Sequence, residues 1–332
     1  MASILVTGGS GFIGSNLCRT LLEQGHTVHA VDNLITGKRE NVAPLLSQRQ
    51  FSFYELDIVD VSILDTFKKK HLDYIYHLAC PTGVPNLTIL AEEMLRTCSI
   101  GTFHVLELAR QHHARVLYAS SAEVYGDPEV FPQHEEYTGN VHPLGPRSAY
   151  EEGKRFSEAC ISMYASRYAV DARVVRIFNT YGPGMSLDDT RVIPQFVRSV
   201  RDNKPLRIYG DGGQTRAHMY VDDLVRGFLV VMEKGNVGEA YNLGNDIPMT
   251  IRALADLVIE LTGHKAGIDF RPHFISDHGK RCPTVEKVKK LGWQPSIAIE
   301  EGLNQMFALH LAVPNTMPVL ATRRTQSRAR RA

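Results

Sequence analysis

Three glycines spaced three residues apart, Gly8, Gly11 and Gly14, lie between a short apolar run and an amphipathic stretch near the start of the chain. The run at residues 4–7 predicts a buried strand, and the stretch at residues 12–24 predicts a helix. Because glycine lacks a side chain, such a turn brings the backbone amides of the helix N-terminus close to a phosphate group. The chain is therefore expected to begin as a strand-turn-helix unit with a phosphate-binding turn.

Strand-like and helix-like stretches alternate beyond this turn. Apolar runs of four to six residues predict strands, and the amphipathic stretches between them predict helices. Alternation of this kind implies right-handed crossovers, so we expect an α/β fold with a doubly wound, Rossmann-like parallel sheet that helices cover on both faces. The predicted strands are residues 4–7, 27–31, 51–56, 74–78, 115–119 and 172–177, and the predicted helices are residues 12–24, 62–70, 87–113 and 149–168.

The pattern changes after residue 179, where glycine and proline interrupt shorter pieces. We expect residues 1–178 to form the Rossmann-like domain. Residues 179–312 are expected to form mainly a smaller α/β domain, interleaved with the first and lying over the carboxyl edge of its sheet. Residues 313–332 contain five arginines and are predicted to be a flexible, basic tail. Further helices are predicted at residues 192–202, 221–233, 251–262 and 299–310.

Charge and cysteine content narrow the class of protein. The formal net charge is +1, and removing the five arginines of the tail leaves −4, so the body of the chain has no electrostatic signature of nucleic-acid binding. The five cysteines form no CxxC pair, and no apolar run approaches the length of a membrane span. We therefore expect a cytoplasmic protein with reduced thiols and no nucleic-acid or membrane partner. Because no histidine has companions at ligand spacing, we predict no metal site.

An acidic residue, Asp32, follows the second predicted strand and lies 18 residues beyond Gly14. A carboxylate at this place accepts hydrogen bonds from both adenosine-ribose hydroxyls and repels a 2′-phosphate, which favours NAD over NADP as the cofactor. Asp57 and Ile58 follow the third strand, where the adenine edge would lie. The residues that we assign to the cofactor are Gly8, Gly11, Phe12, Ile13, Gly14, Asp32, Asn33, Thr36, Gly37, Asp57, Ile58, Leu78 and Ala79, together with Tyr150 and Lys154.

Tyr150 and Lys154 open the predicted helix at residues 149–168. A spacing of four residues places the phenol and the ammonium on one face of the helix. A neighbouring cation favours the phenolate, so Lys154 would bring the pKa of Tyr150 toward the range in which tyrosine acts as a base. The pair is common by chance, but it is far more specific after a glycine-rich nucleotide turn.

These motifs resemble the extended short-chain dehydrogenase/reductase family over nearly the whole body of the chain. Members combine the tyrosine and lysine with a serine or threonine after the fifth strand, where this sequence has Ser121. The resemblance implies that Tyr150 is the base toward a sugar hydroxyl and that Ser121 shares its hydrogen bond. It implies that Lys154 lowers the pKa of Tyr150 and holds the nicotinamide ribose. It also implies a homodimer built from the helices around residues 87–113 and 149–168.

Residues 126–133, 139–147 and 176–183 resemble the UDP-glucuronate decarboxylases in particular. This resemblance implies oxidation of the sugar C4 hydroxyl and loss of the carboxylate from the resulting β-keto acid. The product is then UDP-xylose, or UDP-4-keto-pentose released before reduction. Glu123 is the implied proton-transfer group at C5, and Arg281 is the implied cation near the sugar. The other residues assigned to the UDP-sugar substrate are Pro81, Asn179, Arg191 and Arg216.

The sequence also departs from those decarboxylases. Ala122 stands where they carry a serine and where related dehydratases carry an aspartate that protonates the leaving hydroxyl, which argues strongly against dehydration and mildly against ordinary decarboxylation. Two other functions stay open: an NAD-dependent nucleotide-sugar 4-epimerase, and a non-catalytic NAD-binding sensor or RNA-associated protein. An epimerase would have no need of Glu123 and Arg281. The other departures are Cys98 for asparagine, Leu87 for tyrosine, Gly184 for arginine and Thr284 for aspartate.

Overall fold

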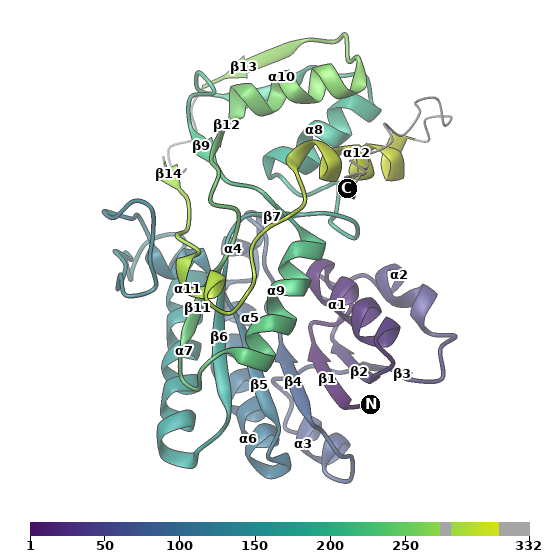
Figure 1. Ribbon diagram of the computed structural model, residues 1–332, viewed down its shortest axis with the longest axis vertical. Coiled ribbons are helices and arrows are strands. Elements are labelled where there is room, and N and C mark those ends of the chain that lie inside the picture. The colour runs from purple at the N-terminus through teal and green to yellow at the C-terminus, as the bar shows by residue number, and fades with distance from the viewer. Residues whose placement is uncertain (273–279, 312–332) are drawn as a thin grey trace, which may run out of the picture.

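A parallel sheet of seven strands forms the centre of the larger lobe (Figure 1) in the computed structural model, which describes residues 1–272 and 280–311. The strand order β11-β6-β5-β4-β1-β2-β3 changes direction between β1 and β4, so the doubly wound α/β fold predicted from the sequence is confirmed. The strands are β1 (Ser3–Thr7), β2 (Thr27–Asp32), β3 (Phe51–Glu55), β4 (Tyr74–His77), β5 (Arg115–Ser121), β6 (Ala172–Ile177) and β11 (Ala240–Leu243).

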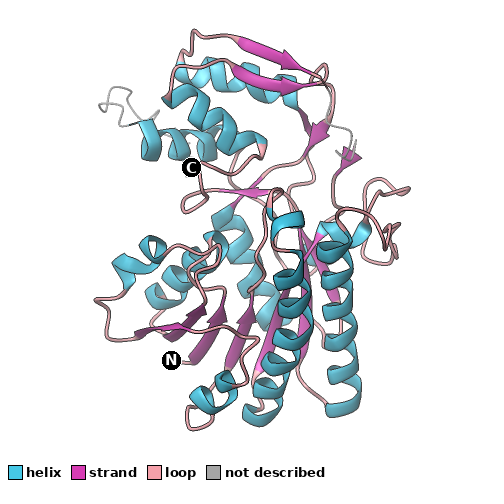
Figure 2. Cartoon of the chain, turned by 180° about the vertical axis from the view of Figure 1, so that it is seen from behind, coloured by secondary structure: helices cyan, strands magenta, loops and turns pink. Residues whose placement is uncertain are grey.

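Helices cover both faces of this sheet, which explains why its strands are apolar throughout. In β1, the adjacent residues Leu5 and Val6 are both fully buried and belong to separate apolar clusters. Successive side chains of a strand point to opposite faces, so each cluster lies on one face of the sheet. Figures 1 and 2 show the two faces, with α1 (Phe12–Glu23) and α9 (Val221–Lys234) on one, and α3 (Ser62–Phe67), α6 (Thr102–His112) and α7 (Ser148–Tyr168) on the other.

The prediction of a single helix over residues 87–113 is wrong. The chain instead breaks at Leu90, whose backbone has φ −116° and ψ 32°. Apolar positions keep a helical spacing across the break, since Leu87, Met94 and Cys98 are all buried, and periodicity alone therefore hides it. The observed pieces are α4 (Asn86–Ile89), α5 (Ala91–Arg96), the π-helical turn η2 (Thr97–Gly101) and α6.

The chain returns to the main sheet after it has entered the smaller lobe. Strand β11 pairs in parallel with β6, so a segment far along the sequence completes the sheet. The helices predicted at residues 192–202, 221–233, 251–262 and 299–310 are confirmed to within one residue at each end. In the described part of the chain, no helix is long and apolar enough to cross a membrane. The predicted tail at residues 313–332 lies outside the described residues.

Three helices and several short strands make up the smaller lobe (Figure 1). Strand β8 pairs in parallel with β13. Strand β9 lies between β12 and β14 and pairs with both. Strand β7 pairs with β10 close to the boundary with the larger lobe. The helices are α8 (Val192–Arg201), α10 (Ile251–Thr262) and α12 (Ile299–Leu311). The strands are β7 (Thr180–Tyr181), β8 (Leu206–Tyr209), β9 (Thr215–Arg216), β10 (Met219–Tyr220), β12 (Met249–Thr250), β13 (Ile268–Arg271) and β14 (Lys280–Arg281); the short helices α2 (Arg39–Val42), η1 (Ala43–Leu45), η3 (Ala122–Tyr125) and α11 (Glu286–Lys289) complete the described elements.

A buried carboxylate, Asp223, joins the start of α9 to the segment that precedes α12. Its oxygens accept hydrogen bonds from the backbone amides of Ser296 at 2.8 Å and Ile297 at 2.9 Å. The Trp293 indole donates to the Asp223 backbone carbonyl at 3.0 Å, and the Arg226 guanidinium forms an ion pair with the carboxylate. This cluster fixes α12, and with it the smaller lobe, to a helix that packs on the main sheet.

We predict that Asp223→Ala lowers the free energy of unfolding by about 3 kcal/mol, because it leaves buried amides and a cation without their acceptor. Urea unfolding followed by circular dichroism measures the change. The neighbouring Asp222 is a matched control, since its carboxylate lies 3.7 Å from Arg19 at the surface, and Asp222→Ala should cost less than about 1 kcal/mol. Equal losses in the two variants would contradict the role given to Asp223.

Candidate active site

A cavity of about 620 Å³ opens at the carboxyl edge of the main sheet and extends to the smaller lobe. Its wall is built from the turn after β1, the ends of β2, β4, β5 and β6, the start of α7, and β14. Of the residues assigned to the site from the sequence, all except Arg216 line this cavity. The fold thus brings together residues as far apart in the chain as Gly8 and Arg281, while their individual roles stay predictions.

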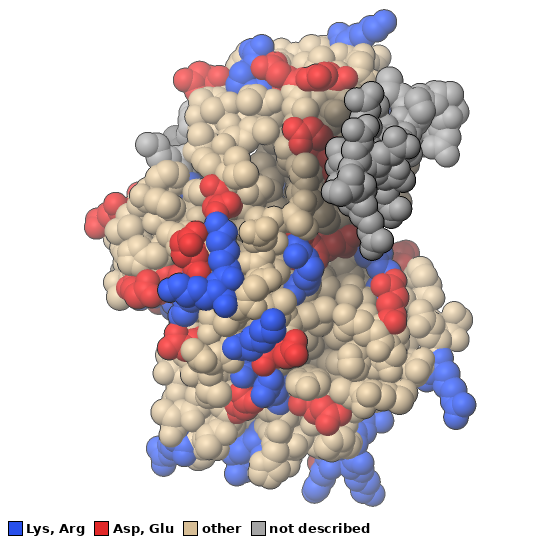
Figure 3. All heavy atoms as spheres, in the orientation of Figure 1, with Lys and Arg blue, Asp and Glu red and all other residues tan. Residues whose placement is uncertain are grey.

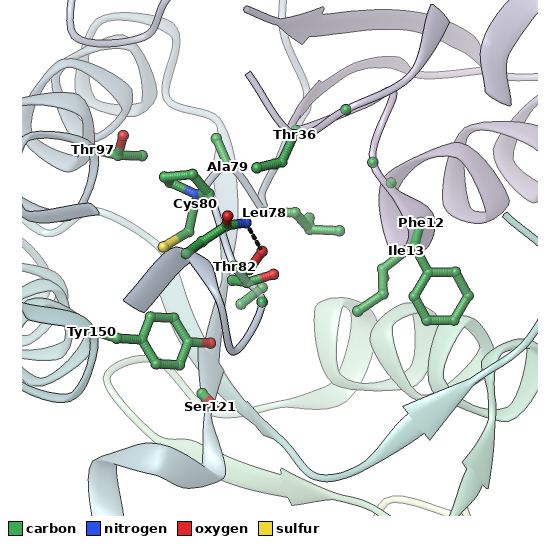
Figure 4. A pocket seen from close by; sticks show the side chains of 18 of the residues that line it. Phe12, Ile13, Thr36, Leu78, Ala79, Cys80, Thr82, Thr97, Ser121 and Tyr150 are labelled. Carbon is green, nitrogen blue, oxygen red and sulfur yellow. Dashed lines mark hydrogen bonds between the residues drawn. The ribbon is translucent and has the colours of Figure 1, made fainter. Parts of the chain in front are cut away.

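The glycine turn lies at one end of the cavity. A Cβ at Gly14 would lie 2.0 Å from the Gly8 carbonyl oxygen, so no larger residue fits where α1 starts against the strand. Gly11 is the N-cap of α1 and provides no side-chain cap. Phe12 and Ile13 of the first helical turn line the cavity (Figure 4). The uncapped helix N-terminus fits the binding of a pyrophosphate, as NAD requires.

The Asp32 carboxylate is held at the end of β2 by backbone amides. Its oxygens accept hydrogen bonds from Ser10 at 3.0 Å and Leu34 at 2.9 Å. A Cβ at Gly37 would lie 2.7 Å from one carboxylate oxygen, so glycine keeps this side of the acid open. Each carboxylate oxygen can accept a further hydrogen bond. The carboxylate lies in the cavity wall, so it suits hydrogen bonds from the two hydroxyls of an adenosine ribose.

The remaining residues assigned to the cofactor line the wall beyond Asp32. The Asn33 side-chain amide donates to the Asp57 carboxylate at 3.0 Å, which ties the end of β2 to the segment after β3. Ile58 follows in the same segment and is buried. Leu78 and Ala79, after β4, also line the cavity, and Figure 4 draws them beside Thr36 and apart from Phe12 and Ile13.

Tyr150, Lys154 and Ser121 meet on the opposite side of the cavity. The phenol of Tyr150 points toward Ser121 (Figure 4). The buried Lys154 ammonium donates to the Ala119 carbonyl at 2.7 Å and lies 5.9 Å from the Tyr150 ring centroid. Burial raises the pKa of Tyr150 to about 12, against the lowering effects of the Lys154 cation and of a hydrogen bond with Ser121. The sequence predicted the lowering by Lys154 but not the larger opposing effect of burial.

Glu123, just after β5, is held between two guanidinium groups. Arg281 of β14 and Arg147 at the start of α7 each form an ion pair with its carboxylate. Burial alone would raise the pKa of Glu123, but the two arginines outweigh burial and lower that pKa to about 2. Arg147 also lines the cavity and bonds to Glu151. Arg147 was not among the site residues predicted from the sequence. Its position three residues before Tyr150 could have indicated that it lies at the start of the same helix, next to the site.

The residues assigned to the diphosphate and the uridine lie toward the smaller lobe. Asn179 follows β6, and Arg191 stands before α8 with its guanidinium on the Asp189 carboxylate at 2.7 Å. Arg216 of β9 is half-buried, donates to the Thr215 carbonyl at 2.8 Å and does not line the cavity. Burial, Arg216 and Arg191 together lower the pKa of His218 to about 4.

Three of the five departures noted in the sequence line the cavity: Ala122, Leu87 and Gly184. Cys98 is buried behind the wall, and its sulfur lies 3.8 Å from that of Cys80, which does line the cavity. Among the described residues, no group of three or more histidine, cysteine or acidic side chains is arranged to hold a metal ion.

Comparison with known proteins agrees with this geometry. Residues 4–244 match the NAD dependent epimerase/dehydratase family. The chain belongs to this family. UDP-glucuronic acid decarboxylase 1 from Danio rerio is 42% identical over 303 residues, which cover 91% of this chain and 71% of that protein. The resemblance predicted from the sequence is thereby confirmed, and the cofactor expected from the glycine turn and Asp32, NAD, is the cofactor of the family.

Solved structures of the same fold are also similar. UDP-glucose 4-epimerase from Thermotoga maritima, solved with UDP-glucose, superposes with a TM-score of 0.84 at 32% identity, covering 92% of this chain and 97% of that chain. The dTDP-glucose 4,6-dehydratase from Bacillus anthracis, solved in complex with NAD, superposes with a TM-score of 0.81 at 28% identity, covering 93% of this chain and 96% of that chain.

We predict that the protein binds NAD at least about 10-fold more tightly than NADP, a difference of about 1.4 kcal/mol, because a 2′-phosphate would face the Asp32 carboxylate. Asp32→Asn should reduce this preference, since it removes the charge while keeping the shape of the side chain. Isothermal titration calorimetry with both cofactors measures the ratio. An unchanged ratio in Asp32→Asn would show that another group excludes the phosphate.

Proposed function

We propose that this protein is an NAD-dependent decarboxylase of UDP-glucuronate, which forms UDP-xylose or releases UDP-4-keto-pentose. The observation that carries the proposal is the pair of arginines, Arg147 and Arg281, that meets Glu123 in the same cavity as Tyr150 and Ser121. An oxidation of a sugar hydroxyl needs only the tyrosine side of this cavity. The arginine side adds guanidinium groups, which can bind the carboxylate of a substrate.

Oxidation at C4 is assigned to Tyr150. Its phenolate takes the proton of the C4 hydroxyl, and Ser121 shares the hydrogen bond. Lys154 stabilises the phenolate from within the helix and would hold the nicotinamide ribose. Bound NAD would supply an acceptor for the two electrons of the alcohol, as a hydride, and a later source of them.

Loss of the carboxylate follows from the chemistry of the ketone. In a β-keto acid the electrons of the breaking carbon–carbon bond pass into the carbonyl group, so carbon dioxide leaves without an added nucleophile. The chain must hold the carboxylate beforehand and deliver a proton to C5 afterwards. Arg281 and Arg147 suit the first task, since guanidinium groups match the two oxygens of a carboxylate.

Glu123 is assigned the proton at C5. With both arginines on its carboxylate its pKa is about 2, so it is ionised at neutral pH and has no proton to give. A substrate carboxylate that engages Arg281 takes away one of the cations that keep this pKa low. The pKa of Glu123 then rises because burial opposes the charged form, and this is the direction that a proton donor requires.

Binding of the nucleotide is assigned to the smaller lobe. Arg191 lines the cavity, and a guanidinium group suits the oxygens of a diphosphate. Arg216 does not line the cavity, and its assignment to the nucleotide rests on the resemblance alone. On the face drawn in Figure 3, Lys and Arg alternate with Asp and Glu and form no continuous basic surface, which favours a small nucleotide over a nucleic acid as partner. All five cysteines are free, in keeping with a cytoplasmic location.

A homodimer is proposed from the apolar surface of α5, η2, α6 and α7. Leu95, Ile100, Phe103 and Phe156 are 38–47% exposed there. The rings of Phe103 and Phe156 contact each other with centroids 6.1 Å apart, so this surface is continuous between α6 and α7. Exposed apolar residues that gather on adjacent helices favour burial against a second copy.

The first test is a proton NMR time course of the purified protein with UDP-glucuronate and NAD. We expect UDP-xylose or its 4-keto precursor to appear, and Tyr150→Phe to slow this by at least about 100-fold because the base is lost. UDP-galacturonate as the product would instead establish a 4-epimerase. A protein that binds NAD but leaves the mixture unchanged would be a sensor, and the decarboxylase proposal would fail.

The pH dependence of turnover tests the pairing of Tyr150 with Lys154. A base whose pKa is raised works better as the pH rises, so kcat/KM should increase on its acidic side up to the pKa of Tyr150. Lys154→Met removes a cation that lowers this pKa, so the rising limb should move to higher pH. Lys69→Met, an exposed change of the same charge, should leave the limb in place. If the rising limb of kcat/KM lay at the same pH in both variants, the base would be a group other than Tyr150.

The dimer is tested by sedimentation velocity. Phe103→Asp should convert the dimer into a monomer, because it places a charge in the proposed apolar contact. Ile247→Asp, at a residue that is 73% exposed in the smaller lobe, should leave the dimer intact. A wild-type protein that sediments as a monomer at all concentrations would overturn the proposal.

A further inference from the structure

Two cysteines far apart in the sequence approach each other beside the active-site lysine. Cys80 follows β4, and Cys98 lies in the π-helical turn η2, yet their sulfurs are 3.8 Å apart. Cys80 lines the cavity, and its sulfur lies on the Tyr150 side in Figure 4. Cys98 is only 2% exposed and lies behind it. A small molecule in the cavity can therefore reach the first sulfur, and the second is within reach of the first.

The packing of α7 keeps room for this pair. A Cβ at Gly153 would lie 3.2 Å from the Cys98 Cβ and 3.3 Å from its sulfur, so α7 approaches η2 closely at this point. The Ser157 hydroxyl donates to the Cys98 backbone carbonyl at 2.7 Å and fixes the same turn. Both thiols are therefore held between the end of β4 and the helix that carries Tyr150 and Lys154.

The charge around the two sulfurs differs from that around the other cysteines. A hydrogen bond from Cys80 and the nearby Lys154 cation lower the pKa of Cys98, although burial opposes this, whereas the same hydrogen bond and burial raise the pKa of Cys80. Burial raises the pKa of Cys160 and of Cys282 to about 11, and also raises that of Cys18. The hydrogen bond between the sulfurs and the nearby Lys154 cation thus favour a thiolate at this pair, and a thiolate is the species that attacks a peroxide and forms a disulfide.

We propose that Cys80 and Cys98 form an oxidation site, at which a peroxide converts the two thiols into a disulfide and thereby slows the enzyme. The proton shared in the Cys80–Cys98 hydrogen bond moves to Cys98, and the Cys80 thiolate attacks one peroxide oxygen. The O–O bond breaks, and the departing hydroxide takes a solvent proton to form water. The Cys98 sulfur then attacks the sulfenic acid at Cys80, and its proton leaves with the displaced hydroxide as a second water. Two electrons pass from the sulfurs to the peroxide, so the step balances.

The disulfide changes the wall of the active site. The sulfurs are 3.8 Å apart and must approach to about 2.05 Å, which pulls the segment after β4 toward η2. That segment carries Ala79 and Pro81, both assigned to the site. The bond also removes a thiolate that neighbours the Lys154 ammonium. The effect on turnover rests on the proposed decarboxylase function, whereas formation of the disulfide does not.

The test treats the full chain with a small molar excess of hydrogen peroxide, blocks free thiols by alkylation and maps the peptides by mass spectrometry. We expect a Cys80–Cys98 linked peptide that is two hydrogens lighter than the reduced pair and that disappears after dithiothreitol. Turnover of UDP-glucuronate, followed by NMR in the same samples, should fall severalfold and recover with the reductant. Peptides that keep both thiols open to alkylation would overturn the proposal, whatever the activity.

Matched variants separate the pair from other thiols. Cys80→Ser and Cys98→Ser, each compared with its own untreated sample, should lose the reversible fall in turnover. Cys160→Ser, one of the other buried cysteines, should respond to peroxide as the wild type does. Circular dichroism confirms that each variant is folded. A linked peptide without a change in turnover would retain the site but refute its effect on the enzyme, and a reversible fall in both serine variants would refute the pair as its cause.

Discussion

The ammonium group of Lys154 is buried between a strand and a helix, and the chemistry proposed for the cavity depends on it. It donates to the Ala119 carbonyl at 2.7 Å and lies 4.9 Å from the Tyr118 ring centroid, so a backbone oxygen and an aromatic face replace the water it has lost. The same cation favours the ionised forms of Tyr150 and Cys98. Moving α7 by a small distance would alter all of these groups together, which is why the packing of this helix on β5 matters for the site.

The parallel sheet determines which residues can meet. All strands of the main sheet end at the same edge, and the change of direction between β1 and β4 leaves space there for the cavity. Residues just after β2, β4 and β5 therefore face one volume although they are widely separated in sequence. The smaller lobe adds the arginine of β14, whose ion pair with Glu123 joins the two lobes across this space. The residues assigned to the cofactor and those assigned to the sugar thus lie on two sides of one opening.

Much of the fold follows from local patterns in the chain, because buried strands and amphipathic helices differ in period. The glycine turn, Asp32, Tyr150 and Lys154, which local patterns singled out, all line the cavity, while their roles stay predictions. The break at Leu90 could not be predicted, since apolar spacing continues across it. The clamp of Arg147 on Glu123 and the approach of Cys80 to Cys98 depend on tertiary contacts between distant segments, for which a single sequence contains no periodic signal.

The return of the chain to the main sheet has a mechanical consequence. After β6 the backbone enters the smaller lobe, comes back through α9 and β11, leaves again to form β12 and α10, and returns once more through α11 before α12. Two lobes joined by one linker can swing apart when a few backbone angles change, but here every connection would have to bend at the same time. These several connections therefore resist a hinge motion of one lobe against the other, as a single flexible linker would not.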